Sequence, residues 1–307
     1  MKNQLMLFGV TLAKRYTKRQ KRIFYTQVVP FFKDLKFAVS FQNVKKKLLH
    51  VSNIIIGDID RAEYLLVCPY DTPSRSLLPY IYYPFNSSKN LSRENRELFI
   101  RTLIYICASV LAYFVFKQFS SFSTLLKVIS ILLFIGLIVF CYRLVVGIPN
   151  TFNFNKNSAS VALIAALAEG LSKNKRVAYV LLDHACSQDT GWRIFTEDEK
   201  VKDKTIIYID CVSIGKALAC VHDSSMSMEA KKLVETLNDV NVIDQVVPEG
   251  QIKDTKLQAH PKMIHLCVGE IENHYFLVRD TCSKNDYKVD LPNLEALKEG
   301  LTKYLGV

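Results

Sequence analysis

Two long apolar runs, at residues 98–116 and 125–146, dominate the hydrophobic pattern of the chain. Each is about the ~20 residues that an α-helix needs to cross the ~30 Å hydrocarbon core of a bilayer. Both runs are apolar on every side, and only the short stretch 117–124 separates them. The pattern predicts two antiparallel membrane-spanning helices, with a pair of buried core helices as the alternative.

Basic residues are unequally distributed around these runs. Six lie on the outer flanks, Lys89, Arg93, Arg96, Arg101, Arg143 and Lys156, whereas the turn side has only Lys117 and Lys127. Short cytoplasmic flanks of membrane helices are enriched in Lys and Arg. We therefore expect a protein of the cell membrane, with both chain ends and the remaining domain in the cytoplasm.

Outside this hairpin, strand-like and helix-like segments alternate. Strands are predicted at 51–57, 63–68, 177–182, 205–209, 262–268 and 274–278, and helices at 157–171 and 291–305. The central runs VAYVLL and TIIYI are continuously apolar, which is typical of strands buried on both faces. The alternation predicts an α/β three-layer sandwich around a mostly parallel mixed sheet.

The same pattern divides the chain into four parts. An N-terminal segment, 1–36, precedes the first part of the α/β domain, 37–96. The transmembrane hairpin region, 97–147, then separates it from the second part, 148–307. We expect the two parts to form one domain, with the hairpin inserted between two of its elements.

Positive charge is concentrated at the start of the chain. The 307 residues carry a net charge of +11, and residues 1–50 hold twelve Lys and Arg against one acid, so the remainder is neutral. At 3.6 residues per turn, Leu5, Phe8, Leu12, Tyr16 and Ile23 share one helix face, and Lys14, Lys18, Lys21 and Arg22 lie mostly opposite. Segment 1–36 is predicted as a basic amphipathic helix whose apolar face packs on the domain or on lipid. Membrane lipid is an expected partner because anionic lipids attract Lys and Arg.

The sequence has no motif for nucleotide binding, nucleic-acid binding or a paired-cysteine framework. It has no P-loop, no dinucleotide fingerprint and no aromatic–basic stripe, so we expect no nucleic-acid partner. The eight cysteines are scattered singly, without the paired spacing of a zinc ribbon or a disulfide framework. A composition rich in Lys, Asn and Ile is typical of a low-GC bacterium.

Polar residues follow the predicted strands at their carboxyl ends, where open α/β sheets bind ligands. These stretches are 68–72 (CPYDT), 155–161 (NKNSASV), 183–186 (DHAC), 209–212 (IDCV) and 280–286 (DTCSKND). Their order resembles that of the two-zinc aminopeptidases, with relatives among glutamate carboxypeptidases and glutaminyl cyclases. That family has His-x-Asp, Asp-Asn-Ala-Ser-Gly-Val, Glu-Glu, Asn-x-Asp and a late His-Thr-x-x-Asp in the same order. The resemblance covers most of residues 50–307 outside the hairpin, and it implies the zinc-exopeptidase fold.

The departures from this pattern concern the metal ligands. By the resemblance, the first zinc-binding His falls on Pro69, the bridging Asp on Lys156, and the late His on Cys282. The catalytic Glu and its neighbour fall on or about Ala185 and Cys186. The cleft at the family's metal positions would comprise Pro69, Asp71, Lys156, Asn157, Asp210, Cys282 and Asp286, with no catalytic residue and no metal set retained. We expect Lys156 to form a salt bridge with Asp210 or Asp71 instead.

Three functions follow as hypotheses. The first is a membrane-anchored pseudoenzyme on an aminopeptidase fold, without a cofactor, that binds or scaffolds a peptide or protein. The second is an active metallo-exopeptidase or other hydrolase with a rebuilt site drawn from Asp71, His184, Asp210 and Cys282, which would bind zinc. A thiol nucleophile, Cys282 or Cys186 with His184, is a variant of this second hypothesis. The third is a lipid-surface protein whose basic helix alone carries the function.

The position of the hairpin predicts where the cleft opens. The hairpin leaves the chain after the strand ending at Cys68 and returns just before Lys156, so both of its ends lie on the strand-end side of the sheet. We therefore expect the cleft to open toward the membrane surface. Its ligand would be membrane-near, such as the cytoplasmic end of a membrane peptide or a partner subunit.

Overall fold

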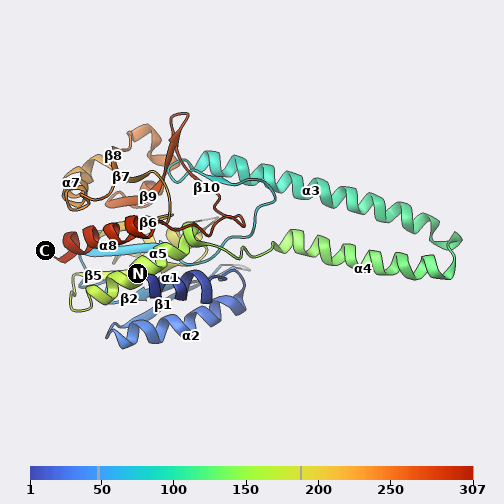
Figure 1. The fold of residues 1–307 in the computed structure, drawn as a ribbon, viewed down its shortest axis with the longest axis horizontal. Helices are drawn as coiled ribbons and strands as arrows, with labels where there is room; N and C mark the ends of the chain where they lie inside the picture. Colours follow the sequence, from blue (N-terminus) through green and yellow to red (C-terminus); the bar gives the residue numbers. More distant parts are fainter. Residues whose placement is uncertain (47–48, 187–188, 307) are drawn as a thin grey trace.

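A ten-stranded mixed sheet forms the centre of the molecule (Figure 1). The computed structural model describes residues 1–46, 49–186 and 189–306. The strands are β1 Val39–Lys46, β2 Leu49–Ile56, β3 Tyr64–Pro69, β4 Ile81–Tyr82, β5 Val177–Leu182, β6 Thr205–Asp210, β7 Ala217–His222, β8 Val242–Val246, β9 Met263–Glu272 and β10 Tyr275–Arg279. The centre of the sheet is parallel, in the order β5-β3-β6-β9. Antiparallel strands extend it on both sides: β2 and β1 beyond β5, and β7 and β10 beside β9.

Helices cover both faces of this sheet. They are α1 Lys2–Met6, α2 Lys18–Asp34, α3 Ser87–Gln118, α4 Thr124–Val146, α5 Ala159–Gly170, α6 Thr190–Thr196, α7 Ser227–Thr236 and α8 Leu291–Gly306. Helices α1, α2, α5, α7 and α8 contribute to the apolar cluster on one face, and α6 to the cluster on the other. The predicted α/β class with a mixed sheet is confirmed. The strands and helices predicted outside the hairpin correspond to β2, β3, β5, β6, β9, β10, α5 and α8.

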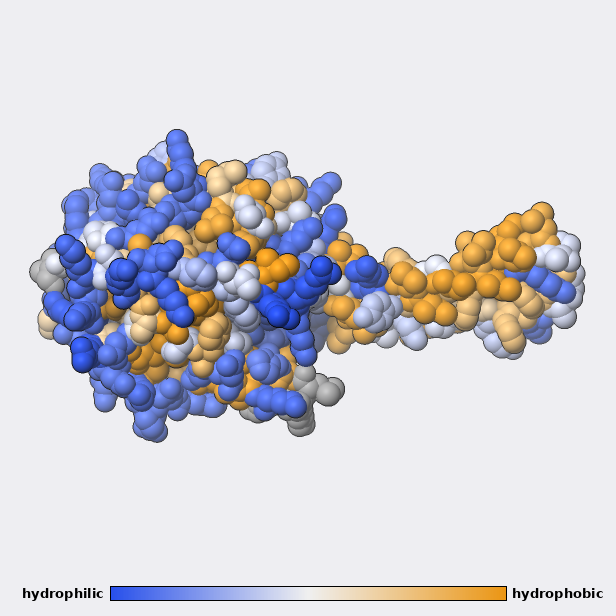
Figure 2. Space-filling view, turned by 90° about the horizontal axis from the view of Figure 1, so that it is seen from below, coloured by the Kyte–Doolittle hydropathy of each residue, from blue (hydrophilic) through white to orange (hydrophobic). Residues whose placement is uncertain are grey.

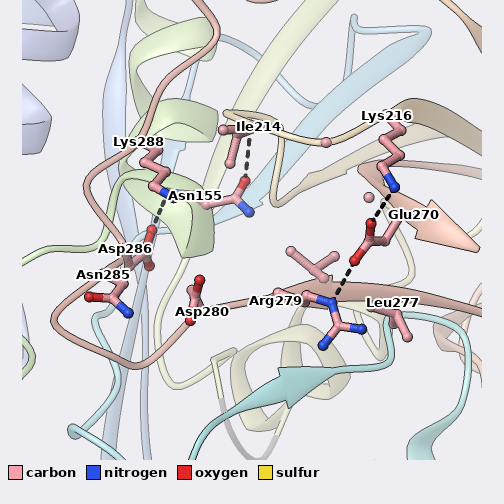
Figure 3. A pocket seen from close by; sticks show the side chains of 13 residues that line it. Asn155, Ile214, Lys216, Glu270, Leu277, Arg279, Asp280, Asn285, Asp286 and Lys288 are labelled. Carbon is pink, nitrogen blue, oxygen red and sulfur yellow. Dashed lines mark hydrogen bonds and ion pairs between the residues drawn. The ribbon is translucent and has the colours of Figure 1, made fainter. Parts of the chain in front are cut away.

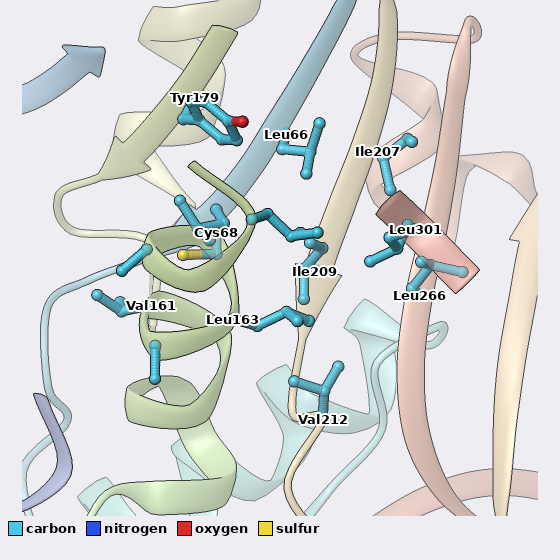
Figure 4. Packing of buried hydrophobic residues seen from close by; sticks show 14 of the residues in the cluster. Leu66, Cys68, Val161, Leu163, Tyr179, Ile207, Ile209, Val212, Leu266 and Leu301 are labelled. Carbon is cyan, nitrogen blue, oxygen red and sulfur yellow. The ribbon is translucent and has the colours of Figure 1, made fainter. Parts of the chain in front are cut away.

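The continuously apolar strands are explained by burial on two faces. Side chains alternate along a strand, so Leu66 of β3 joins the core on the α5 side while Leu65 and Val67 join the opposite core. Figure 4 shows the first of these cores, with strand side chains packed against Val161 and Leu163 of α5. The carboxyl ends of the parallel strands are thereby held at one edge of a rigid sheet.

The N-terminal segment differs from the single helix predicted over 1–36. It consists of α1, a π-helical turn at Leu7–Thr11, a non-helical stretch, and α2, which begins after a Thr17 cap. The helix is interrupted because Arg15 turns inward, where its guanidinium donates to the carbonyls of Phe8 and Leu12. Lys21, predicted on the solvent side, is buried beside Asp183.

Most of the predicted apolar face of this segment packs on the domain, whereas Ile23 is 50% exposed. Phe8, Phe24, Val28 and Phe32 are fully buried in the main core. Their aromatic rings meet edge to face, as for Phe8 and Phe24 with centroids 6.1 Å apart.

Helices α3 and α4 project from the domain as an antiparallel hairpin (Figure 1). Both are long and apolar enough to cross a membrane. No residue of α3 is buried, and Leu144 is the one buried residue of α4. Figure 2 shows the hairpin as an apolar arm beside a largely hydrophilic domain. The alternative of two buried core helices is therefore wrong.

Candidate functional site

A cleft of about 750 Å³ lies between the carboxyl edge of the sheet and the base of the hairpin. Its floor includes four side chains singled out in the sequence, Asp71, His184, Cys186 and Cys282. Its outer wall is formed by the first turns of α3, residues 93–98, with Arg101 and with Val146 at the end of α4. The prediction that the strand ends face the hairpin is confirmed.

A buried ion pair occupies the centre of this edge. The Lys156 ammonium lies 3.6 Å from Asp210 Oδ1, and both side chains are almost completely buried. Asp210 Oδ2 also accepts a hydrogen bond of 2.7 Å from the Tyr82 hydroxyl. The Lys156 ammonium stands 3.5 Å from the centre of the Tyr82 ring, a cation–π contact. The predicted salt bridge is therefore formed with Asp210.

The two charges hold each other ionised. Burial favours the neutral form of both groups. The Asp210 carboxylate nevertheless raises the pKa of Lys156 well above its usual range. Against the same effect of burial, the Lys156 ammonium lowers the pKa of Asp210. The two side chains thus neutralise each other inside the protein. Removing either one would leave the other as a buried, unpaired charge.

Local backbone structure places Lys156 over the sheet edge. It lies in a π-helical turn, Phe154–Ser158, that leads into α5. The Asp286 carboxylate accepts hydrogen bonds from the backbone N–H groups of Asn155, at 2.6 Å, and Lys156, at 3.2 Å. Figure 3 shows Asp286 and Asn155 in the wall of a second pocket, of about 390 Å³.

Asp71, Asn157 and Cys186 form a second group of contacts. Asp71 Oδ1 accepts a hydrogen bond of 3.0 Å from the Ala185 N–H. Its backbone carbonyl accepts from the Asn157 amide and, at 2.8 Å, from the Cys186 thiol. Burial raises the pKa of Asp71, although Lys21 opposes that shift. Pro69, the position without a side-chain donor, ends β3 two residues before.

Arg15 donates hydrogen bonds to Asn157 and to the residues next to this group. Its Nη2 donates to Asn157 Oδ1 at 2.9 Å and to Ser158 Oγ at 2.8 Å, and its Nε donates to the Tyr70 carbonyl. The side chain is fully buried, and burial lowers its pKa to about 10. The N-terminal segment also lines the cleft directly, through Tyr16, Thr17 and Lys21.

His184 belongs to a third cluster, with Lys21 and Asp183. The Lys21 ammonium contacts the Asp183 carboxylate and lies 3.2 Å from His184 Nε2. His184 adopts a left-handed backbone conformation, with φ 47°, as do Cys211 at 54° and Cys282 at 63°. Such strain is concentrated at functional sites in proteins. All three residues lie just after strand ends.

Three groups of the proposed rebuilt site, Asp71, His184 and Cys282, line the same cleft, whereas Asp210 is not among the lining residues. Among the described residues, no three His, Cys, Asp or Glu side chains are arranged to hold a metal ion. His184 contacts Lys21 and Asp183, whereas Asp210 pairs with Lys156. Burial raises the pKa of the Cys282 thiol to about 12 and that of Cys186 well above its usual range. Neither thiol is therefore activated as a nucleophile.

Four side chains that build this site were missed from the sequence: Arg15, Lys21, Tyr82 and Asp183. Arg15 and Lys21 stand in a stretch where basic residues are frequent, so nothing distinguishes them locally. Tyr82 reaches Asp210 because the two-residue strand β4 pairs with β10. That pairing is between segments almost 200 residues apart, and it has no local signature.

Comparison with solved structures identifies the architecture. A glutaminyl cyclase of Porphyromonas gingivalis is 14% identical with a TM-score of 0.56. A glutaminyl cyclase of Tannerella forsythia is 10% identical with a TM-score of 0.59, and a Zn-dependent exopeptidase of Parabacteroides distasonis 11% with 0.55. Each match covers 99% of this chain and 94% of the other chain. The chain has the zinc exopeptidase/glutaminyl cyclase fold.

The resemblance inferred from the order of strand-end motifs is therefore confirmed for the fold. No family profile and no curated protein matches the sequence. At identities of 10–14%, the solved structures establish the architecture alone.

The residues at this edge do not fit the zinc that the exopeptidase fold implies. A zinc site needs three or four N, O or S ligands around one point. Here an ammonium group lies beside the central carboxylate, where it repels a divalent cation. The described residues supply no such ligand set.

We predict that Lys156→Met destabilises the protein by about 3–5 kcal/mol, because it leaves the Asp210 carboxylate buried and unpaired. Lys156→Met with Asp210→Asn should recover most of that loss, since both charges are gone and Tyr82 keeps an acceptor. Chemical denaturation of the full chain in detergent measures both variants. Equal stability of the wild type and the single variant would contradict this account.

Asp286 should make the free energy of unfolding fall as the pH rises from about 4 to about 7. Burial raises its pKa to about 7 in the folded chain, against about 4 when unfolded. The folded state therefore binds this proton more tightly, so the stability it contributes is complete below about pH 4 and lost as the pH rises to about 7.

The amide side chain of Asp286→Asn cannot ionise, so this variant should not show the loss of stability between about pH 4 and pH 7. The free energy of unfolding of the wild type, relative to the variant, should fall between these pH values by up to about 4 kcal/mol. Asp239→Asn, at an exposed position, serves as the control. A constant difference between the wild type and Asp286→Asn across this range would show that Asp286 does not titrate there.

Proposed function

We propose that this protein is a membrane-anchored pseudoenzyme that binds a peptide or protein segment in the cleft at the base of its hairpin. The Lys156–Asp210 ion pair at the centre of the strand-end edge carries this proposal. It balances charge internally at the place where the exopeptidase fold would need metal ligands. A cleft of about 750 Å³ lies at the same edge of the sheet, with a volume suited to a few residues of a ligand.

The hairpin supports membrane anchoring in this proposal. An apolar arm with almost no buried residue needs an apolar surrounding, and its length matches a bilayer. Because basic residues flank its domain side, the α/β domain would lie in the cytoplasm. Arg101, near the domain end of the apolar run, is held by Glu97 at 3.1 Å and by the Leu144 carbonyl at 3.0 Å.

The cleft walls suggest what kind of ligand enters. Leu98 and Val146 form an apolar side of the cleft next to the hairpin. Three charged residues that precede the apolar run of α3 also line the cleft: Arg93, Glu94 and Arg96. A polypeptide that emerges from the membrane presents apolar and then polar groups in the same order. The proposed ligand is therefore the cytoplasmic end of a membrane peptide or of a partner subunit.

An active hydrolase remains the second candidate, and its support is the fold itself. The enzymes with similar folds include a Zn-dependent exopeptidase and glutaminyl cyclases. Against it stand the separated positions of His184 and Asp210 and the buried, unactivated thiols.

The cleft proposal predicts position-dependent crosslinking in the intact membrane. A photoreactive benzoylphenylalanine at Arg96, an exposed residue of the cleft wall, should crosslink to a polypeptide that stays in the membrane after alkaline extraction. The same group at Met228, which is 72% exposed on α7, is the control. Equal crosslinking from both positions, or crosslinking only to soluble proteins, would contradict the proposal.

The topology proposal predicts which side of the membrane each part occupies. In a Cys107→Ser, Cys141→Ser background the remaining cysteines are buried. A membrane-impermeant maleimide added to intact cells should then label Ser121→Cys in the hairpin turn. It should label Asp239→Cys in the domain only after lysis, and the reverse pattern would show that the domain lies outside.

A further inference from the structure

Two chain segments are joined beside the base of the hairpin. The Tyr16 hydroxyl donates to the Val146 carbonyl, at the last residue of α4, over 2.5 Å. The Asn153 amide donates to the Ala13 carbonyl over 3.1 Å. Gly147 permits this close approach, since a Cβ there would lie 2.6 Å from the Tyr16 oxygen. The stretch that follows the hairpin is therefore fixed against residues 9–17.

This junction carries positive charge without acidic residues. Residues 1–33 and 147–168 contain no Asp or Glu. Four basic side chains between residues 14 and 22 are exposed and form no ion pair with a described residue: Lys14, Lys18, Arg19 and Arg22. Lys18 and Arg19 occupy the first turn of α2, which begins two residues after Tyr16.

A shallow apolar groove of about 450 Å³ lies within the same junction. It is lined by residues 9–14, by Thr151, Phe152 and Phe154, and by the start of α2. Val10 is 54% exposed, Ile23 50% and Phe152 41%. Figure 2 shows this side of the domain, with strongly hydrophilic and apolar side chains together near the arm.

We infer that this junction is a lipid-contact surface, which binds the anionic headgroups of the bilayer that the hairpin spans. The inference rests on the proposed membrane insertion of α3 and α4. Three observations favour lipid as the occupant: direct continuity with the end of α4, unpaired cations without acids, and apolar side chains beside them. Amphipathic surfaces with these features bind at membrane interfaces.

The consequence is a fixed orientation of the cleft. The hairpin alone holds the domain at one point, around which it can tilt. A second contact through residues 9–23 and 148–154 would hold the domain against the headgroups, on the side where Tyr16 and Thr17 also line the cleft. The opening of the cleft would then stay next to the membrane surface, where polypeptides emerge from the bilayer.

Fluorescence quenching in nanodiscs tests this inference on the full chain. The probe is NBD on Thr151→Cys, an exposed residue of the groove, in the Cys107→Ser, Cys141→Ser background. A nitroxide on the lipid headgroup is the quencher. Nanodiscs contain phosphatidylcholine alone or with phosphatidylglycerol, and NBD on Met228→Cys reports the background.

We expect stronger quenching at Thr151→Cys in anionic than in neutral nanodiscs, and loss of that difference at high salt. Lys14→Gln, Lys18→Gln and Arg19→Gln together should weaken the contact by about 100-fold, at roughly fivefold per charge. Replacing Lys173, Lys175 and Lys303 is the matched control. These three exposed residues lie where α5 and α8 end, beside the 2.7 Å bond from Asn174 to the Leu305 carbonyl.

The outcomes separate this inference from the proposed function. Incorporation into nanodiscs with Thr151→Cys quenched no more than Met228→Cys would overturn the lipid-contact surface and leave the anchored pseudoenzyme intact. Quenching that ignores lipid charge, or that the control triple variant reduces equally, would also overturn it. Failure of the chain to enter nanodiscs would contradict the proposed membrane anchor and, with it, the lipid-contact surface.

Discussion

The interaction on which the site depends is the buried pair of Lys156 and Asp210. Two opposite charges out of water persist only when each compensates the other. Asp210 comes from the end of a central strand, Lys156 from the turn that starts α5, and Tyr82 from a distant edge strand. The pair therefore ties three separate elements together at the edge where this fold would otherwise place metal ligands. A cleft of about 750 Å³ lies at the same edge, and among the described residues no group of His, Cys, Asp or Glu is arranged to hold a metal ion.

The remaining parts of the site are built around that edge from segments outside the sheet. The N-terminal segment supplies Arg15 below Asn157 and Lys21 beside Asp183. The hairpin supplies the outer wall of the cleft. The same two segments meet where Tyr16 contacts the end of α4. The apolar arm, the basic segment and the cleft thus form one connected structure.

Periodicity and strand-end order were sufficient for much of this architecture. Continuous apolar runs predicted β5 and β6 because both faces of those strands are buried. The family resemblance predicted a salt bridge of Lys156 with Asp210 or Asp71, and in the structure the partner is Asp210. Residues 1–36 were mispredicted as one helix because tertiary hydrogen bonds of Arg15 override a local periodic pattern. Tyr82 was missed for a related reason, since its contact depends on a long-range strand pairing.

The zinc content of the full-length protein, purified in detergent and determined by elemental analysis, distinguishes a charge-balanced edge from a metal site. The account predicts less than about a tenth of a zinc ion per chain, because an ammonium group occupies the centre of the edge. Lys156→Asp, which restores a carboxylate there, is the comparison. About one zinc ion or more per wild-type chain, lost in Asp210→Asn, would contradict the account and show that the edge is a working metal site.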